Sequence, residues 1–167
     1  NFGTTDVTRT ISLNNNNKRI KNIFTRVLKG HIAVAAYKIR NNTCGAQIDI
    51  AARKPLKEIN LDYSHGTGHG VGYFLNVHEG PHAISKNNKI NFKNGMIVSN
   101  EPGYYENGKF GIRIENLINV KKNKTFKFLS FPTISSSGPN GAIIHYKADK
   151  KSNRVLKNGD LYLVDSG

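Results

Sequence analysis

Residues 110–120 read "FGIRIENLINV", and this stretch alternates between two kinds of side chain. Ile112 and Ile114 point to one side of an extended chain, whereas Arg113 and Glu115 point to the other. A strand with one apolar and one charged face is typical of an antiparallel sheet that is buried on one side only. We therefore expect a strand here that carries functional groups on its polar face.

Other stretches of the chain also predict strands. Residues 95–103, "GMIVSNEPG", form a short apolar run that ends at Glu101. Residues 1–13 alternate as well, and their polar face carries Asp6, Thr8 and Thr10. Two further strands are expected in "NGAIIHY" (140–146) and "DLYLVDSG" (160–167).

Two helices are expected between these strands. Residues 18–37 place apolar side chains three or four positions apart, which indicates an amphipathic helix in which Gly30 is tolerated. A second, shorter helix is expected from about residue 45 to 54, with its end near Pro55. The chain is thus assigned to the α+β class, with an antiparallel sheet and helices on one of its faces.

Length and composition limit the classes of function. The 167 residues suffice for one domain with a core. The net charge of +14 suggests nucleic-acid binding, but the bases are scattered and interspersed with Asn, so we favour solvated loops. Cys44, the single cysteine, allows no intramolecular disulfide, and no histidine motif pairs with it. No apolar run approaches the length of a membrane span.

Four acidic residues differ from the others because they lie within or at the end of expected strands: Asp6, Glu101, Glu115 and Asp165. A carboxylate there is costly unless it is paired or bound to a cation. An ion pair or a turn cap would explain any one of them. Four such acids together favour a cation site.

Histidines accompany these acids. His65 and His69 lie in "SHGTGHGVG" (64–72), His78 lies in "NVHEGP" and His145 in "AIIHY". The glycine-rich stretch lacks the Lys-Ser/Thr of a phosphate-binding loop, and the glycines leave room for a ligand. Four carboxylates and one imidazole suit two divalent cations of the Mn, Co or Zn type. Two such ions clamp a bridging hydroxide and polarise a carbonyl, and Arg113 would hold a ligand carboxylate in place.

Long motifs resemble those of a known family. They are "HGTGHGVGYFLNVHEGP" (65–81), "NEPGYYENGKFGIRIEN" (100–116), "GTTDVTRT" (3–10), "PTISSSGPNGAIIHY" (132–146) and "LYLVDSG" (161–167). Together they resemble the catalytic domain of the X-prolyl aminopeptidases (aminopeptidase P), which belong to the pita-bread metallopeptidases. The resemblance implies a curved antiparallel sheet with helices on its outer face.

The same resemblance implies roles for individual residues. The metal ligands would be Asp165, Asp6, His69, Glu101 and Glu115. Glu101 would also act as the general base, His78 and His145 would contact the substrate, and His65 would lie near the scissile bond. Tyr105 would line the substrate pocket. The two ions would be manganese, with cobalt or zinc as alternatives.

The implied reaction is hydrolysis of the N-terminal Xaa-Pro bond of peptides with proline at the second position. A prolidase-like dipeptidase and a non-catalytic pita-bread binding module are the alternatives. The resemblance further implies a cytoplasmic protein and a homodimer formed through regions that this chain lacks. We expect neither a membrane nor a nucleic acid as a partner.

The order of the motifs departs from the family. In the family, the segment corresponding to 129–167 precedes the segment corresponding to 1–128, and here it follows it. We expect residues 1–167 to form a single catalytic domain, either circularly permuted near residues 126–129 or joined from segments in unusual order. The helices that normally precede "FPTISS" are missing, so the fold is expected to be incomplete. Joining the termini would leave a hairpin about three residues short, so we expect the chain ends to lie close together.

Overall fold

The computed structural model describes residues 4–12, 17–72, 74, 76–121, 134–137, 147, 149–152 and 162–165. The chain divides into two compact units, Asn1–Thr125 and Phe126–Gly167. Each unit is described by itself below. Within the described residues, no helix combines the length and the apolar character needed to cross a membrane.

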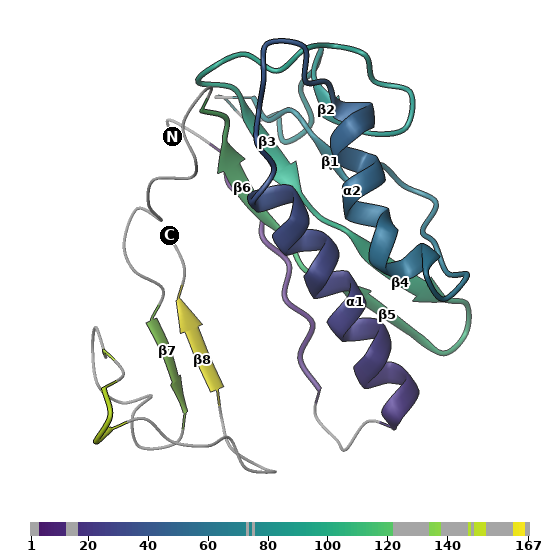
Figure 1. Ribbon diagram of the computed structural model, residues 1–167, viewed down its shortest axis with the longest axis vertical. Helices are drawn as coiled ribbons and strands as arrows, with labels where there is room; N and C mark the ends of the chain where they lie inside the picture. Colours follow the sequence, from purple (N-terminus) through teal and green to yellow (C-terminus); the bar gives the residue numbers. More distant parts are fainter. Residues whose placement is uncertain are drawn as a thin grey trace. The chain divides into compact units, whose positions relative to one another are not determined.

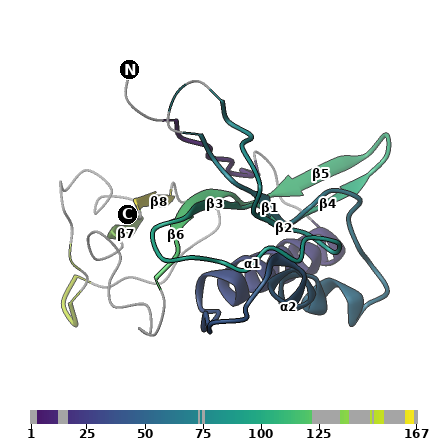
Figure 2. The ribbon, with the colours of Figure 1, turned by 90° about the horizontal axis from the view of Figure 1, so that it is seen from above.

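Two helices pack against each other in the first unit. Helix α1 spans Lys18–Ala35, and the side chain of Asn17 caps it by accepting a hydrogen bond from the backbone N–H of Ile20. Helix α2 spans Gly45–Lys57. Both helices lie on the same side of the strands of this unit (Figure 2), as the α+β assignment predicts.

The expected end of the second helix near Pro55 was wrong. Pro55 lies inside α2, which continues to Lys57. Proline has no backbone N–H, so it cannot donate the hydrogen bond that this position normally gives to the carbonyl four residues earlier. Continuation of the helix buries Leu56 completely, and the carbonyl oxygen of Pro55 accepts a hydrogen bond from Arg26 Nη1 at 2.5 Å. Packing of the last turn thus outweighs the local preference of proline.

The described residues of the first unit also form six short strands, which Figure 1 labels β1 to β6. They are β1 (Gly68–His69), β2 (Ala83–Ile84), β3 (Ile97–Asn100), β4 (Gly103–Glu106), β5 (Phe110–Arg113) and β6 (Asn116–Asn119). The pairs β1–β2, β3–β6 and β4–β5 are all antiparallel. A bridge between Gly70 and Val98 joins β1 to β3, and a bridge between Thr8 and Glu115 attaches the N-terminal segment.

The stretch 110–120 forms two strands where the sequence predicts one. It is interrupted at Ile114 and Glu115, and its two halves pair with different partners: β5 with β4, and β6 with β3. The predicted apolar face is nevertheless confirmed, because Ile112 and Ile114 pack in one apolar cluster with residues of both helices. Glu115 on the other face is also buried, but it faces polar groups. Alternation of side chains indicates which residues face the apolar core. It does not indicate where the chain passes from pairing with one strand to pairing with another.

Two apolar clusters connect the helices to the strands. Ile23 and Val27 of α1 and Leu56 of α2 pack with Ile112 and Ile114. The second cluster joins both helices to β2, β3 and the segment before β3; it consists of Val34, Ile48, Ala52, Ile84, Phe92, Val98 and Val120. These clusters cover the face of the strands that is turned toward the helices. The opposite face of the strands is therefore available for polar groups.

The second unit contains one described hairpin. Strands β7 (Ile134–Ser137) and β8 (Tyr162–Asp165) are antiparallel, with Ile134 opposite Asp165. The predicted strand at 160–167 is confirmed for its central residues. The predicted strand at 140–146, with His145, lies outside the described residues. So do residues 1–3 and 166–167, on which the expected closeness of the chain ends depends.

Gly30 lies at a close approach of the two helices and provides a test of this packing. A Cβ atom at residue 30 would lie 2.3 Å from the carbonyl oxygen of Ala52, so any larger residue must push α1 away from α2. We expect Gly30→Ala to lower the melting temperature, because overpacking costs ~1–3 kcal/mol and exceeds the gain of about 1 kcal/mol from helix propensity. Thermal unfolding measures the change.

The matched control is Lys29→Ala, which changes the adjacent exposed residue of the same helix. It should leave the melting temperature nearly unchanged. A Gly30→Ala variant as stable as the control would contradict the close packing of α1 on α2.

Candidate metal centre

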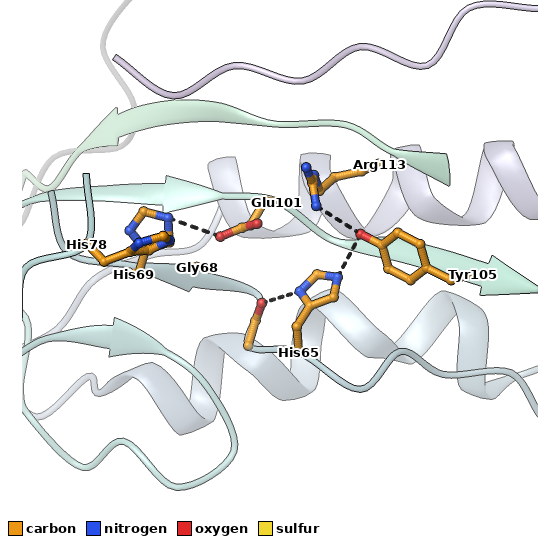
Figure 3. Close-up of a pocket in the computed structure, with 8 residues that line it drawn as sticks. His65, Gly68, His69, His78, Glu101, Tyr105 and Arg113 are labelled. Carbon is orange, nitrogen blue, oxygen red and sulfur yellow. Dashed lines mark hydrogen bonds and ion pairs between the residues drawn. The ribbon is translucent and has the colours of Figure 1, made fainter. Parts of the chain in front are cut away.

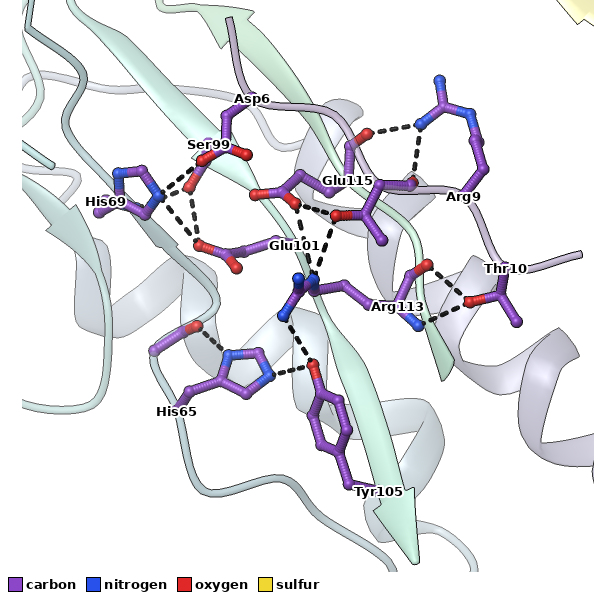
Figure 4. Close-up of polar contacts among 12 residues, drawn as sticks. Asp6, Arg9, Thr10, His65, His69, Ser99, Glu101, Tyr105, Arg113 and Glu115 are labelled. Carbon is purple, nitrogen blue, oxygen red and sulfur yellow. Dashed lines mark hydrogen bonds and ion pairs between the residues drawn. The ribbon is translucent and has the colours of Figure 1, made fainter. Parts of the chain in front are cut away.

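Four predicted ligand residues converge on the face of the strands opposite the helices (Figure 4). Asp6 comes from the N-terminal segment, His69 from β1, Glu101 from the residue after β3, and Glu115 from the link between β5 and β6. The Nε2 atom of His69 lies 3.3 Å from Asp6 Oδ2 and 3.3 Å from Glu101 Oε1. Ligand atoms of Asp6, His69 and Glu115 all lie within 4.8 Å of one another.

The backbone explains how distant segments meet here. Thr8 and Glu115 exchange two backbone hydrogen bonds of 3.3 and 3.0 Å, which bring the N-terminal segment alongside Glu115. Gly68 brings His69 to the same place from another direction. A Cβ atom at residue 68 would lie 1.9 Å from the carbonyl oxygen of Ser99, so only glycine allows β1 to approach β3 this closely. The glycines around His69 thus serve backbone packing as well as room for a ligand.

Two hydroxyl groups that the sequence analysis did not assign to the site orient its carboxylates. The Oγ atom of Ser99 accepts a hydrogen bond from the backbone N–H of His69 at 2.9 Å and donates to Glu101 Oε1 at 3.0 Å. The hydroxyl of Thr8 donates to Glu115 Oε2. The signal for Ser99 was its position two residues before Glu101 in the stretch 95–103 predicted as a strand, since side chains two apart on an extended chain share a face.

The electrostatics of the cluster favour a bound cation. Glu115 is 2% exposed, and its carboxylate faces those of Asp6 and Glu101. Burial, followed by the negative charge of Glu115, raises the pKa of Glu101. Arg113 Nε, 3.6 Å from Glu115 Oε2, compensates only part of this charge. Three carboxylates and an imidazole form a donor set that suits a divalent cation, so the residues fit a metal site.

A pocket of about 360 Å³ opens beside these ligands (Figure 3). It is lined by His65, Gly66, Gly68, His69, His78, Glu101, Tyr105 and Arg113. The ring of His78 lies 4.1 Å from that of His69, measured between centroids. The hydroxyl of Tyr105 lies 2.9 Å from His65 Nε2 and accepts from Arg113 Nη1 at 3.3 Å. The pocket thus combines candidate metal ligands with groups suited to holding a substrate.

Two predicted site residues belong to the second unit. The backbone of Asp165 ends strand β8, and nothing is described of its side chain. His145 lies outside the described residues. Their assignment as ligand and substrate contact therefore stays a prediction.

Comparison with known proteins identifies the family. The sequence pattern of metallopeptidase family M24 matches residues 1–122 and, separately, residues 119–167. The chain belongs to this family. The resemblance expected from the motifs is thereby confirmed.

Curated relatives in this metallopeptidase family are strongly similar over most of the chain. The probable Xaa-Pro aminopeptidase P of Laccaria bicolor is 56% identical over 126 residues, which are 74% of this chain and 20% of the relative. The aminopeptidase P2 of Arabidopsis thaliana is 55% identical over 125 residues, which are 74% of this chain and 18% of the relative. The chain thus spans about a fifth of the length of these relatives.

Solved structures of metallopeptidases confirm the pita-bread fold. The X-prolyl aminopeptidase of Caenorhabditis elegans, described as a cytosolic enzyme with a di-nuclear active site, matches with a TM-score of 0.67 and 33% identity. That match covers 98% of this chain and 22% of the enzyme. The prolidase of Pyrococcus furiosus matches with a TM-score of 0.65 and 31% identity, over 71% of this chain and 35% of that enzyme.

Metal binding can be tested without any substrate. A cation that binds only the folded state stabilises it by about 2.7 kcal/mol at one hundred times its Kd. We therefore expect manganese to raise the melting temperature by several degrees. Glu115→Gln should abolish most of this rise, because it removes a buried negative charge from the cluster. Glutamine is chosen because its amide oxygen can still accept the hydrogen bond from Thr8.

Glu58→Gln is the control for loss of a carboxylate, since Glu58 is exposed and pairs with Arg26 outside the cluster. This control should respond to manganese as the unsubstituted protein does. Equal responses of the two variants would exclude Glu115 as a ligand.

Proposed function

We propose that the protein containing this chain is a metal-dependent aminopeptidase that hydrolyses the N-terminal Xaa-Pro bond of peptides. The observation that carries this proposal is the cluster of Asp6, His69, Glu101 and Glu115 at the edge of a pocket lined by His65 and His78. The names of the relatives from Laccaria bicolor and Arabidopsis thaliana support the same activity. A binding module without catalysis would not require these four residues to lie together.

Two divalent ions would be held by the four clustered residues, with Asp165 as the fifth ligand. The di-nuclear active site of the Caenorhabditis elegans enzyme supports this number, and manganese is the metal that we propose first. When bound, such ions make water a stronger nucleophile and polarise the carbonyl of the scissile bond. The cytosolic location of the same enzyme supports a cytosolic location for this protein.

Glu101 is proposed to act as the general base. Its carboxylate lines the pocket beside the other proposed ligands, and a general base must lie within hydrogen-bond reach of the attacking water. Ser99 holds the carboxylate through Oε1, which limits rotation of the side chain. Glu101 would take a proton from the attacking water and deliver it to the nitrogen of proline as that amine leaves.

The remaining pocket residues would orient the peptide. His65 Nδ1 lies 2.7 Å from the carbonyl oxygen of Gly66, so in the neutral ring Nδ1 carries the hydrogen and Nε2 accepts from the hydroxyl of Tyr105. This arrangement fixes the plane of the His65 ring, beside which the scissile bond would lie. His78, and His145 of the second unit, would donate hydrogen bonds to the oxygen that becomes negatively charged.

Residues 129–167 and 1–128 are further proposed to form one catalytic domain in permuted order. Both parts of the chain match the same family, at 1–122 and 119–167, and a single solved enzyme matches 98% of the chain. On this proposal Asp165, the last residue of β8, would act as the fifth metal ligand.

A prolidase-like dipeptidase is the second candidate, favoured by the structural similarity to the Pyrococcus furiosus prolidase. The two activities differ in the length of the substrate. Hydrolysis rates on an Xaa-Pro dipeptide and on longer peptides with the same first two residues therefore distinguish them. An aminopeptidase should cleave the longer peptides efficiently.

The activity is tested by Glu101→Gln in the complete, metal-loaded protein. We expect kcat on an Xaa-Pro peptide to fall by about 10²–10⁴-fold, because the amide no longer accepts the proton of the attacking water. The rate of hydrolysis is measured by chromatography of the released N-terminal residue.

Glu106→Gln is the control, since Glu106 forms ion pairs with Arg19 and Lys109 at the far end of β4. It should retain the activity. Unchanged hydrolysis in Glu101→Gln would refute the role of Glu101, and a metal-loaded protein that leaves Xaa-Pro peptides intact would refute the function.

A further inference from the structure

Arg53 on α2 is a buried arginine that lies outside the pocket. Its described hydrogen bonds go to two carboxylates and two backbone carbonyl oxygens. Its side chain is 10% exposed. The Nε atom donates to Asp49 Oδ2 at 2.7 Å, one turn earlier on the same helix. The guanidinium also lies over the ring of Tyr63, 4.0 Å from its centroid. Burial of a charged side chain is costly unless an opposite charge and hydrogen bonds compensate it.

The other hydrogen bonds of Arg53 all reach the loop that carries His65. The Nη1 atom donates to Asp62 Oδ1 at 2.7 Å and to the carbonyl oxygen of Tyr63 at 2.6 Å. The Nη2 atom donates to the carbonyl oxygen of His65 itself at 2.6 Å. One rigid, planar group therefore fixes three points of the chain within four residues.

Asp49 extends this network to the far end of the loop. Its second oxygen accepts a hydrogen bond from Thr67 Oγ1 at 2.6 Å, and that hydroxyl lies 2.5 Å from the hydroxyl of Tyr63. The carbonyl oxygen of Thr67 in turn accepts from the backbone N–H of Glu101 at 2.8 Å. The pair Asp49 and Arg53 thus holds both ends of the loop against α2.

The charges within this network support each other. Burial by itself lowers the pKa of Arg53, but the hydrogen bonds with Asp49 and Asp62 outweigh burial and raise it. Asp49 is 2% exposed, so its negative charge and that of Arg53 depend on one another. A neutral or shorter side chain at residue 53 would leave buried acceptors without a donor.

We propose that Arg53 is a positioning residue, which fixes the imidazole of His65 in the substrate pocket through the backbone of residues 62–65. This inference rests on the proposed function for its consequence in catalysis. Arg53 does not line the pocket, so its effect must pass through the loop. A displacement of about 1 Å in such a group can lower the rate by ~10²-fold.

The test uses Arg53→Lys in the complete, metal-loaded protein. Lysine keeps the positive charge, but its single ammonium group cannot reach the separate acceptors of the guanidinium fork. We expect kcat/KM on an Xaa-Pro peptide to fall at least ~10-fold, within the range that misplacement of one group produces. The metal content should not change, because the hydrogen bonds and ion pairs of Arg53 involve none of the four proposed ligands whose side chains are described.

Arg26→Lys is the matched control. Arg26 also donates to a backbone carbonyl and a carboxylate near the end of α2, those of Pro55 and Glu58, but to no residue of the 62–67 loop. It should lower the melting temperature without lowering kcat/KM. Equal kinetic losses in the two variants would overturn the proposal, since both would then act through general destabilisation.

A double-mutant cycle separates positioning from stability. If Arg53 acts through His65, Arg53→Lys should have almost no further effect on kcat/KM in a His65→Ala background. A full, additive loss in that background would overturn the proposal. If Arg53→Lys fails to fold, Asp62→Ala replaces it, because this change removes one half-exposed acceptor of the same network. It should lower kcat/KM by a smaller factor. In a His65→Ala background it should lower kcat/KM no further.

A spectroscopic measurement makes the inference independent of activity. The imidazole signals of His65, and amide hydrogen exchange over 62–67, should change in Arg53→Lys and not in Arg26→Lys. If these changes occur in a protein that does not cleave Xaa-Pro peptides, the proposed function fails and the positioning role stands. If cleavage is normal and neither signal changes, the positioning role is refuted.

Discussion

Mutual repulsion among three carboxylates is the constraint on which the arrangement of this protein depends. Asp6, Glu101 and Glu115 face one another around His69, and one of the acids is almost completely buried. Like charges at these distances repel strongly where water is excluded. The surrounding structure must therefore hold them together until a cation compensates their charge. Hydroxyl groups of Thr8 and Ser99 and the guanidinium of Arg113 supply part of this compensation.

In the first unit, the residues that stabilise the fold and the proposed metal and substrate ligands lie on opposite faces of the strands. Apolar side chains of α1, α2 and the inner face of the strands form the packed support. The opposite face carries the carboxylates and the histidines (Figure 4). Because the support is closely packed at Gly30 and Gly68, the outer groups are held on a rigid base. Arg53 links the two faces, since it belongs to the helix layer but fixes the loop of His65.

The sequence predicts the members of the cluster better than the path of the chain between them. Alternation around Ile112 and Ile114 gives the buried face correctly, because side-chain period is a local property of a strand. It does not give the interruption at Glu115, which arises because two halves of the stretch pair with different strands. Pro55 is a similar case, since burial of Leu56 extends α2 beyond the expected stop. The position of Asp165 stays a prediction, because its side chain lies in the second unit.

By itself, the sequence determined the α+β class and the family, and it predicted the polar and apolar faces of the strands and the acids and histidines that we propose as ligands and substrate contacts. Residue type and spacing carry this information, because the chemistry of a ligand resides in its side chain. Only the tertiary structure decided which groups lie close together and how Ser99 connects His69 to Glu101. It also decided that the buried Arg53 donates a hydrogen bond to the backbone of His65. These contacts join residues that are far apart in the chain. Their geometry depends on how the helices and strands pack, and local sequence patterns do not encode it.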